Sequence, residues 1–177
     1  MGTTRRDVIE TERLLLRPLR VDDVDAYVGL HAHDEVSRFL GSYSRSEALD
    51  RLTAVEQGWA ERGHGRCAVE LRTTGDFIGV SGLRYWESFD EVEIAWTLRP
   101  DRWGHGYATE AAGAWLDWGF RNLTDRYFTA MIRPANTRSI RVAERLGFRP
   151  LREDTLFDRP TTVYFLPRPE DRNSGVP

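Results

Sequence analysis

A short segment near the middle of the chain combines residue types that bind anions: Arg102-Trp103-Gly104-His105-Gly106-Tyr107-Ala108-Thr109-Glu110-Ala111. It lies between an expected strand at 92–98 and an expected helix that starts near residue 108. Gly104 and Gly106 let the main chain come close to a phosphate and adopt positive φ. The free N–H groups and the dipole of the following helix attract negative charge. The segment therefore predicts a binding loop for a cofactor that carries a pyrophosphate.

Two common nucleotide-binding loops are excluded for this segment. A Walker A loop needs a Lys, and all 25 basic residues of the chain are Arg. A Rossmann fingerprint needs a third Gly and an early βαβ unit, and both are missing. The remaining alternative to an anion site is a tight connection between strand and helix that binds nothing.

Alternating and helical patterns define the elements that must hold this loop. Seven strands are expected at 14–17, 67–72, 77–85, 92–98, 127–132, 148–152 and 161–166. Four helices are expected: one capped by Asp22 that ends near His31, one opened by a capping box of Ser44 and Glu47, one after Gly106, and one capped by Asn136 and followed by Gly147. Because most strands follow one another directly, the pattern predicts a mixed, mostly antiparallel sheet of six to seven strands in one α/β (α+β) domain with about four helices.

Length and composition limit the possible classes of protein. The chain has 177 residues, of which 40% are hydrophobic, so it can bury a full core. We expect the folded domain at 10–167, between a polar tail at 1–9 and a mobile tail at 168–177. A net charge of −3 offers no basic surface for nucleic acid. One cysteine, Cys67, excludes an internal disulfide and a Cys-rich zinc site. No stretch of about 18 apolar residues is present, so we expect a cytoplasmic protein without membrane contact.

Three segments together resemble one superfamily of enzymes. They are Thr11-Glu12-Arg13-Leu14-Leu15-Leu16-Arg17-Pro18, the loop Trp103-Gly104-His105-Gly106-Tyr107-Ala108-Thr109-Glu110-Ala111, and Asn136-Thr137-Arg138-Ser139-Ile140-Arg141-Val142-Ala143-Glu144-Arg145-Leu146-Gly147-Phe148. In this order and spacing, the chain resembles the GNAT superfamily of N-acetyltransferases. It is more similar to the branch of ribosomal-protein N-terminal (alanine/serine) acetyltransferases. The resemblance implies a GNAT-like fold in which the fourth and fifth expected strands splay apart and acetyl-CoA binds where they part.

The resemblance also assigns residues to acetyl-CoA. It places the pyrophosphate on the loop formed by Arg102, Gly104, His105, Gly106, Tyr107, Ala108 and Thr109. It places the pantetheine arm on the main-chain groups of Ile94, Trp96 and Leu98 and on the side chain of Asn136. Asp101 departs from the family pattern, which commonly has Gln or Arg three residues before the first Gly. We expect Arg102 to supply the positive charge from the next position.

Glu93 and Ser139 are the candidate catalytic residues. An α-amine has a pKa of about 8 and a Lys amine of about 10.4, so the acceptor amine benefits from a base at neutral pH. The resemblance places Glu93 on the acceptor side, where it takes the proton directly or through a water. The alternatives are a solvated strand carboxylate and a carboxylate in an ion pair with a nearby Arg. The resemblance favours Ser139 as the residue that hydrogen-bonds or protonates the sulfur of the departing CoA thiolate. The alternatives are a plain N-cap for Asn136 and an ordinary first-turn serine for Ser139.

The resemblance therefore implies an acetyl-CoA-dependent N-acetyltransferase that works by direct attack of a primary amine, with a protein or peptide N-terminal amine as the first choice. The alternative acceptor is a small-molecule amine, such as an aminoglycoside or a polyamine. A polycation of that kind favours an acidic mouth, for which the chain offers Asp22, Asp23, Asp25, Asp34 and Glu35. A third alternative is a CoA-binding module without catalysis. The four histidines, His31, His33, His64 and His105, show no zinc-type grouping with Cys, so we expect no metal. The resemblance also allows a homodimer.

Overall fold

The computed structural model describes residues 8–171, which contain eight strands and five α-helices. The strands are β1 (Ile9–Glu10), β2 (Leu14–Pro18), β3 (Arg66–Leu71), β4 (Phe77–Trp86), β5 (Glu91–Leu98), β6 (Tyr127–Ile132), β7 (Arg149–Leu156) and β8 (Arg159–Pro167). The helices are α1 (Val24–Ala32), α2 (Asp34–Leu40), α3 (Arg45–Arg62), α4 (Tyr107–Asn122) and α5 (Thr137–Arg145). Short 3-10 turns lie at Val21–Asp23, Pro100–Arg102 and Pro169–Asp171.

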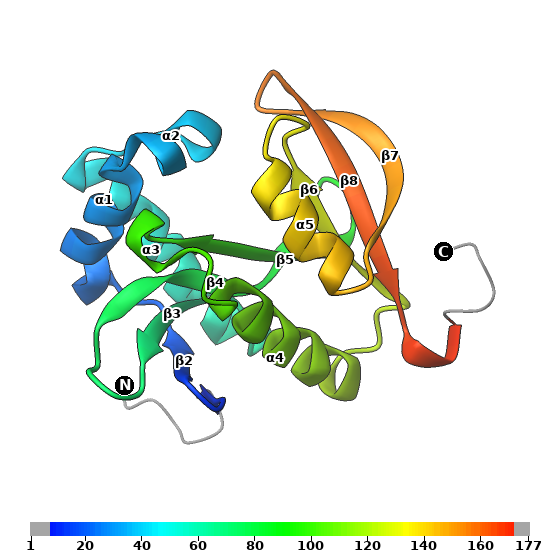
Figure 1. The fold of residues 1–177 in the computed structure, drawn as a ribbon, viewed down its shortest axis with the longest axis horizontal. Helices are drawn as coiled ribbons and strands as arrows, with labels where there is room; N and C mark the ends of the chain where they lie inside the picture. The colour runs from blue at the N-terminus through cyan, green and yellow to red at the C-terminus, as the bar shows by residue number, and fades with distance from the viewer. Residues whose placement is uncertain (1–7, 172–177) are drawn as a thin grey trace.

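The described strands form one sheet in the order β1-β2-β3-β4-β5-β6-β8-β7. Neighbouring strands are antiparallel except β5 and β6, which are parallel and pair at one position, where Glu93 lies opposite Thr129. Beyond that position the two strands separate, and the sheet divides into a β1–β5 half and a β6–β8 half (Figure 1). The expected mixed, mostly antiparallel sheet with splayed central strands is confirmed.

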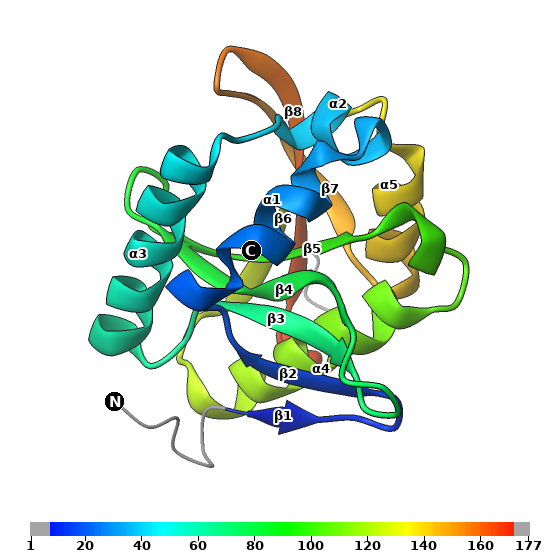
Figure 2. The ribbon, with the colours of Figure 1, turned by 90° about the vertical axis from the view of Figure 1, so that its left-hand side faces the viewer.

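Helices cover the two faces of the β1–β5 half. On one face, strand residues such as Val69 pack against Trp115 and other residues of α4. On the other face, Ala68 packs with Leu52 of α3 and the apolar residues of α1. Val69 and Ala68 are neighbours in the chain and point to opposite faces, as the alternation of a strand requires. In Figure 2, α1 and α3 face the viewer and α4 lies behind the strands.

The helix ends follow the capping residues seen in the sequence. The Ser44 hydroxyl accepts from the Glu47 N–H at 3.3 Å, and the Glu47 carboxylate accepts from the Ser44 N–H at 2.8 Å, so the capping box opens α3 as predicted. Gly63 ends α3 with a φ of 70°. Asn136 caps α5, and Gly147 follows it with a φ of 92°.

Three features differ from the sequence-based expectation. Strand β1 pairs Ile9 with Leu16, although residue 9 falls in the expected polar tail. Helix α2 has seven residues and no side-chain cap, so neither its length nor its start is marked in the sequence. Asp22 does not cap a helix but lies in a 3-10 turn, and α1 begins later, at Val24.

Residues 1–7 and 172–177 lie outside the described residues, so the tails expected at 1–9 and 168–177 stay predictions there. Residues 169–171 of the second expected tail form a 3-10 turn. Within residues 8–171, we find no helix with the length and apolar character needed to cross a membrane.

Candidate active site

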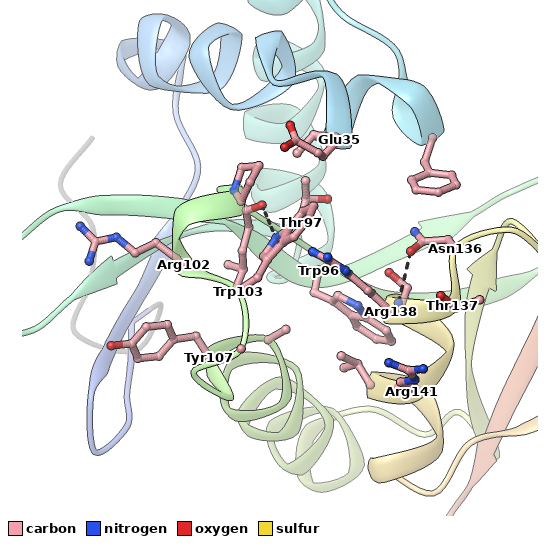
Figure 3. A pocket seen from close by; sticks show the side chains of 18 of the residues that line it. Glu35, Trp96, Thr97, Arg102, Trp103, Tyr107, Asn136, Thr137, Arg138 and Arg141 are labelled. Carbon is pink, nitrogen blue, oxygen red and sulfur yellow. Dashed lines mark hydrogen bonds between the residues drawn. The ribbon is translucent and has the colours of Figure 1, made fainter.

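The main cleft of the described chain opens where β5 and β6 separate. It has a volume of about 830 Å³, and its walls come from α2, the end of β5, the glycine loop with the start of α4, and α5 (Figure 3). Most residues predicted to bind a cofactor or to act in catalysis line it: Trp96, Leu98, Arg102, Gly104, Gly106, Tyr107, Ala108, Thr109, Asn136 and Ser139. The fold therefore brings the glycine loop and the start of α5 to one cleft.

Three predicted site residues do not line this cleft. Ile94 is 1% exposed and belongs to the core on the α4 face. His105 is exposed, and its ring stacks on Tyr107 with the ring centroids 5.6 Å apart. Glu93 points to the face covered by α1 and α3, because it alternates with Ile94 along β5.

The glycine loop has the backbone geometry of an anion site. Gly104 and Gly106 both have a φ of 80°, in the left-handed region that favours glycine. Gly106 is the N-cap of α4 and has no side chain, so the first N–H groups of the helix stay uncapped. The Trp103 indole donates to the Leu98 carbonyl at 2.9 Å and thereby fixes the loop to the end of β5. A phosphate here would meet free N–H groups and the positive end of the helix dipole.

Glu110 ties this loop to the turn between β1 and β2. Its carboxylate accepts from Thr11 Oγ1 at 2.6 Å, from the Arg13 main-chain N–H at 2.9 Å and from Arg13 Nε at 2.7 Å. Burial raises the pKa of the Glu110 carboxyl, but these bonds outweigh burial and leave the pKa below its ordinary value. Arg13 also donates to the His105 carbonyl at 2.8 Å and covers the Tyr107 ring. The sequence analysis did not predict these contacts of Arg13 and Glu110. Its one signal for them was that Arg13 lies in the first of the three segments that resemble the family.

Arginine side chains give the cleft an excess of positive charge. Five arginines line it: Arg38, Arg102, Arg138, Arg141 and Arg145. Among the described residues, Glu35 is the one carboxylate in the lining. Arg102 shares its charge with Asp76 at 3.6 Å and Asp101 at 3.4 Å. In the described part of the chain, the arginines of α5 have no carboxylate at ion-pair distance.

The α5 arginines belong to the site but were not predicted for it. Arg138 stacks on the Trp103 ring of the glycine loop, with its guanidinium carbon 4.4 Å from the ring centroid. Arg138, Arg141 and Arg145 recur every three to four residues, which places them on one face of the helix. This spacing was the signal available in the sequence, but nothing in it shows that the face meets the glycine loop.

Ser139 and Asn136 share the first turn of α5. The Asn136 side chain accepts from the Ser139 N–H at 3.3 Å, so Asn136 does cap the helix. The Ser139 hydroxyl has no hydrogen-bond partner within residues 8–171, and the residue lines the cleft. A free hydroxyl in this place can donate to a group bound in the cleft.

Glu93 lies at the one position that joins β5 to β6 and is 6% exposed. Its Oε2 accepts from the Trp86 indole at 2.7 Å and from Arg66 Nη2 at 3.2 Å. The ion pair with an arginine is therefore present. Both contacts use Oε2, and within residues 8–171 Oε1 has no hydrogen-bond partner.

A family model described as "Acetyltransferase (GNAT) domain" matches residues 13–149. The protein YkkB of Bacillus subtilis (strain 168) is 31% identical over 161 residues, which are 87% of this chain and 92% of that protein. The crystal structure of an acetyltransferase from Agrobacterium tumefaciens str. C58 is 34% identical, with a TM-score of 0.77, over 90% of this chain and 93% of that chain.

Two more distant structures share the fold at 18% identity. One is RimL, named a ribosomal L7/L12 alpha-N-protein acetyltransferase, in complex with coenzyme A, with a TM-score of 0.76 over 90% of this chain and 97% of that chain. The other is the aminoglycoside acetyltransferase AAC(6')-Ib with coenzyme A, with a TM-score of 0.74 over 91% of this chain and 98% of that chain.

Proposed function

The chain belongs to the GNAT acetyltransferase family and is an acetyl-CoA-dependent acetyltransferase; on that premise we propose that it acetylates a primary amine, with a protein or peptide N-terminal amine as first choice. The observation that carries this proposal is the meeting of an uncapped helix N-terminus with an arginine-rich wall at the point where β5 leaves β6. Such a place suits a long ligand with phosphates at one end and a reacting group at the other.

The chain's residues fit coenzyme A. The pyrophosphate belongs on the N–H groups after Gly106. Arg138 and Arg141, which form no ion pair within residues 8–171, supply its counter-charge. Beyond Glu93, the edge of β5 has no pairing to β6, so its main-chain groups near Trp96 remain for the pantetheine amides. When bound, acetyl-CoA supplies an acetyl group activated as a thioester.

The reaction forms a bond from the amine nitrogen to the acetyl carbon and breaks the carbon–sulfur bond. The amine must lose a proton and the CoA thiolate must gain one. We assign the first proton to Glu93, directly or through a water, because its Oε1 has no hydrogen-bond partner among residues 8–171 and lies where β5 and β6 pair. We assign the second to the Ser139 hydroxyl, which lines the cleft without a partner in the described chain.

Two of the five acidic residues considered for a polycationic acceptor form ion pairs elsewhere. Asp23 pairs with Arg17 at 2.7 Å, and Asp25 pairs with Arg45 at 3.2 Å. Of the five, Glu35 lines the cleft, where arginines outnumber it. This balance supports a peptide amine over an aminoglycoside or a polyamine, although proteins of both kinds share the fold.

Thiol release from acetyl-CoA, followed with a panel of amines, tests the proposal. We expect release that depends on a primary amine, together with a mass increase of the amine by one acetyl group. Binding of CoA without release for any amine would support the inactive CoA-binding module instead.

A further inference from the structure

Basic and aromatic side chains gather beside Glu93 on the face of the sheet that is turned away from α4. Arg84 of β4 lies directly across from Glu93 of β5, so both side chains point to this face. Arg66 of β3 reaches the same place, since it contacts Glu93 at 3.2 Å. Arg51 of α3 is close enough to act on the charge of Arg84. We call Arg51, Arg66, Arg84 and Trp86 the acceptor-side cluster.

The positive charge of this cluster is not balanced. Glu93 already binds Arg66 and Trp86 through Oε2. Arg84 packs over the Trp86 ring, with its guanidinium carbon 3.8 Å from the centroid, and within residues 8–171 it has no carboxylate at ion-pair distance. Arg152 shows the opposite case, because it forms two bonds to Glu91, of 2.7 and 3.0 Å.

The surroundings of Arg84 are crowded but open to solvent. Burial lowers the pKa of the Arg84 guanidinium, and repulsion from Arg66 lowers it further, while attraction to Glu93 opposes this shift. The residue as a whole stays exposed. Because Arg84 is exposed and its guanidinium has no carboxylate at ion-pair distance within residues 8–171, it is accessible to an anion from solution. The planar fork of an arginine matches the two oxygens of a carboxylate.

An apolar wall stands next to this charge. The Trp86 ring lies 5.9 Å from the Phe89 ring and 6.1 Å from the Phe157 ring, measured between centroids. Phe157 is 68% exposed at the turn between β7 and β8. Aromatic side chains around a charged contact keep water away and thereby strengthen the contact.

We propose that the preferred acceptors of this enzyme carry a carboxylate a few bonds from the reacting amine, and that Arg84 binds this carboxylate while Glu93 faces the amine. The inference rests on the proposed acetyl transfer. Residues directly opposite in antiparallel strands have Cα atoms only about 4.5–5.5 Å apart, so the two groups of the acceptor must be close. A peptide with an acidic residue near its N-terminus has this chemistry, and so does a free amino acid with its own carboxylate. A polycation would instead meet uncompensated arginines.

Two isosteric pairs of acceptors test the inference and separate its two sources. The first pair is an amidated tripeptide with Asp at its second position and the same peptide with Asn. The second pair is serine and serinamide. For the wild-type enzyme we expect kcat/KM to favour the carboxylate member of at least one pair by about tenfold or more. Arg84→Gln should abolish this preference, and Arg84→Glu should reverse it.

Arg62→Gln is the matched control, because Arg62 stacks on Tyr85 of the same strand at 4.1 Å but lies near Glu87 and outside the cluster. It should keep the preference. The affinity for CoA should be unchanged in all three variants. Equal turnover of both members of each pair, or a preference that survives Arg84→Gln, would overturn the inference and leave acetyl transfer intact. If no amine in the panel releases thiol, the proposed transfer itself is contradicted, and the inference with it.

Discussion

Single residues in this protein combine structural and chemical roles. Glu93 is held by the Trp86 indole and Arg66 at the one position that pairs β5 with β6, so its carboxylate has a fixed direction. Asn136 caps α5 through the N–H of Ser139, while the hydroxyl of Ser139 is left for the cleft. Substitutions at these positions must therefore be chosen so that stability and catalysis are measured apart.

Glu93→Gln should lower the turnover most at neutral pH. Glutamine keeps the shape and can still accept from Trp86, but it cannot take a proton from the acceptor amine. At pH 7 we expect a loss of about 10²-fold or more, which shrinks as the pH rises and the amine loses its proton unaided. The measurement is a pH–rate profile of both proteins, with CoA affinity as the control. A profile parallel to that of the wild type at every pH would remove Glu93 from the mechanism.

Ser139→Ala should reduce kcat with little change in the KM of the acceptor. Negative charge on the leaving sulfur develops only in the transition state, so a donor to it contributes there. Asn136→Ala serves as the comparison: loss of a helix cap costs about 0.5–2 kcal/mol of stability, and a lost pantetheine contact raises the KM for acetyl-CoA. An unaltered kcat in folded Ser139→Ala protein would refute the assignment of the proton donor.

Elements that carry their own signals could be predicted from the sequence, and elements stabilised by distant partners could not. The capping box of Ser44 and Glu47 and the N-cap Asn136 act within one turn of chain, so local spacing reveals them. Helix α2 has no such cap. The bonds of Glu110 with Thr11 and Arg13 join residues that are 99 and 97 positions apart in the chain. Only the folded sheet, which brings β2 beside the start of α4, creates them.

The same limit explains the partial prediction of the site. The glycine loop could be predicted because its residue types alone define a conformation and a charge preference. The α5 arginines acquire their role only when Arg138 stacks on Trp103, across the space between the two halves of the sheet. Likewise, Arg84 comes to lie beside Glu93 only through the register of β4 with β5.

The buried His31 of α1, which bonds to the residue after α2, should make the fold sensitive to mild acid. His31 of α1 must donate from Nδ1 to the Gly41 carbonyl, at 3.1 Å, because a carbonyl only accepts; burial lowers the pKa of His31 to about 4. The unfolded chain takes up this proton near its ordinary pKa of about 6.5. The contribution of neutral His31 to the free energy of unfolding is therefore fully present above this pH, and it falls as the pH drops from about 6.5 towards 4.

His31→Asn keeps a donor at this place and removes the titration. The free energy of unfolding falls between pH 7 and pH 5 in both proteins, and we expect the fall to be about 1–2 kcal/mol smaller in the variant than in the wild type. Denaturant titration at pH 7 and at pH 5 measures both values. His33→Asn, at an exposed neighbour, is the control and should behave like the wild type. An equal loss in the His31 variant would show that other groups cause the acid sensitivity.

At the scale of the whole molecule, the junction of the two half-sheets sets the function. The β1–β5 half supplies the glycine loop and Glu93, and the β6–β8 half positions α5 with its arginines (Figure 1). The cleft exists because β5 and β6 part after one paired position. A homodimer stays a prediction from the resemblance.

Calorimetric titration of CoA tests the central claim, that the cleft between these halves holds the cofactor by its phosphates. Arg141→Gln removes an unpaired cleft charge, and Gly106→Val puts a branched side chain at a φ of 80° on the loop. Gly63→Val, at a φ of 70° with open space around it and outside the cleft, controls for backbone strain. We predict at least about tenfold weaker CoA binding for the first two and wild-type affinity for the third. Unchanged affinity in folded Arg141→Gln and Gly106→Val proteins would contradict this placement of the cofactor.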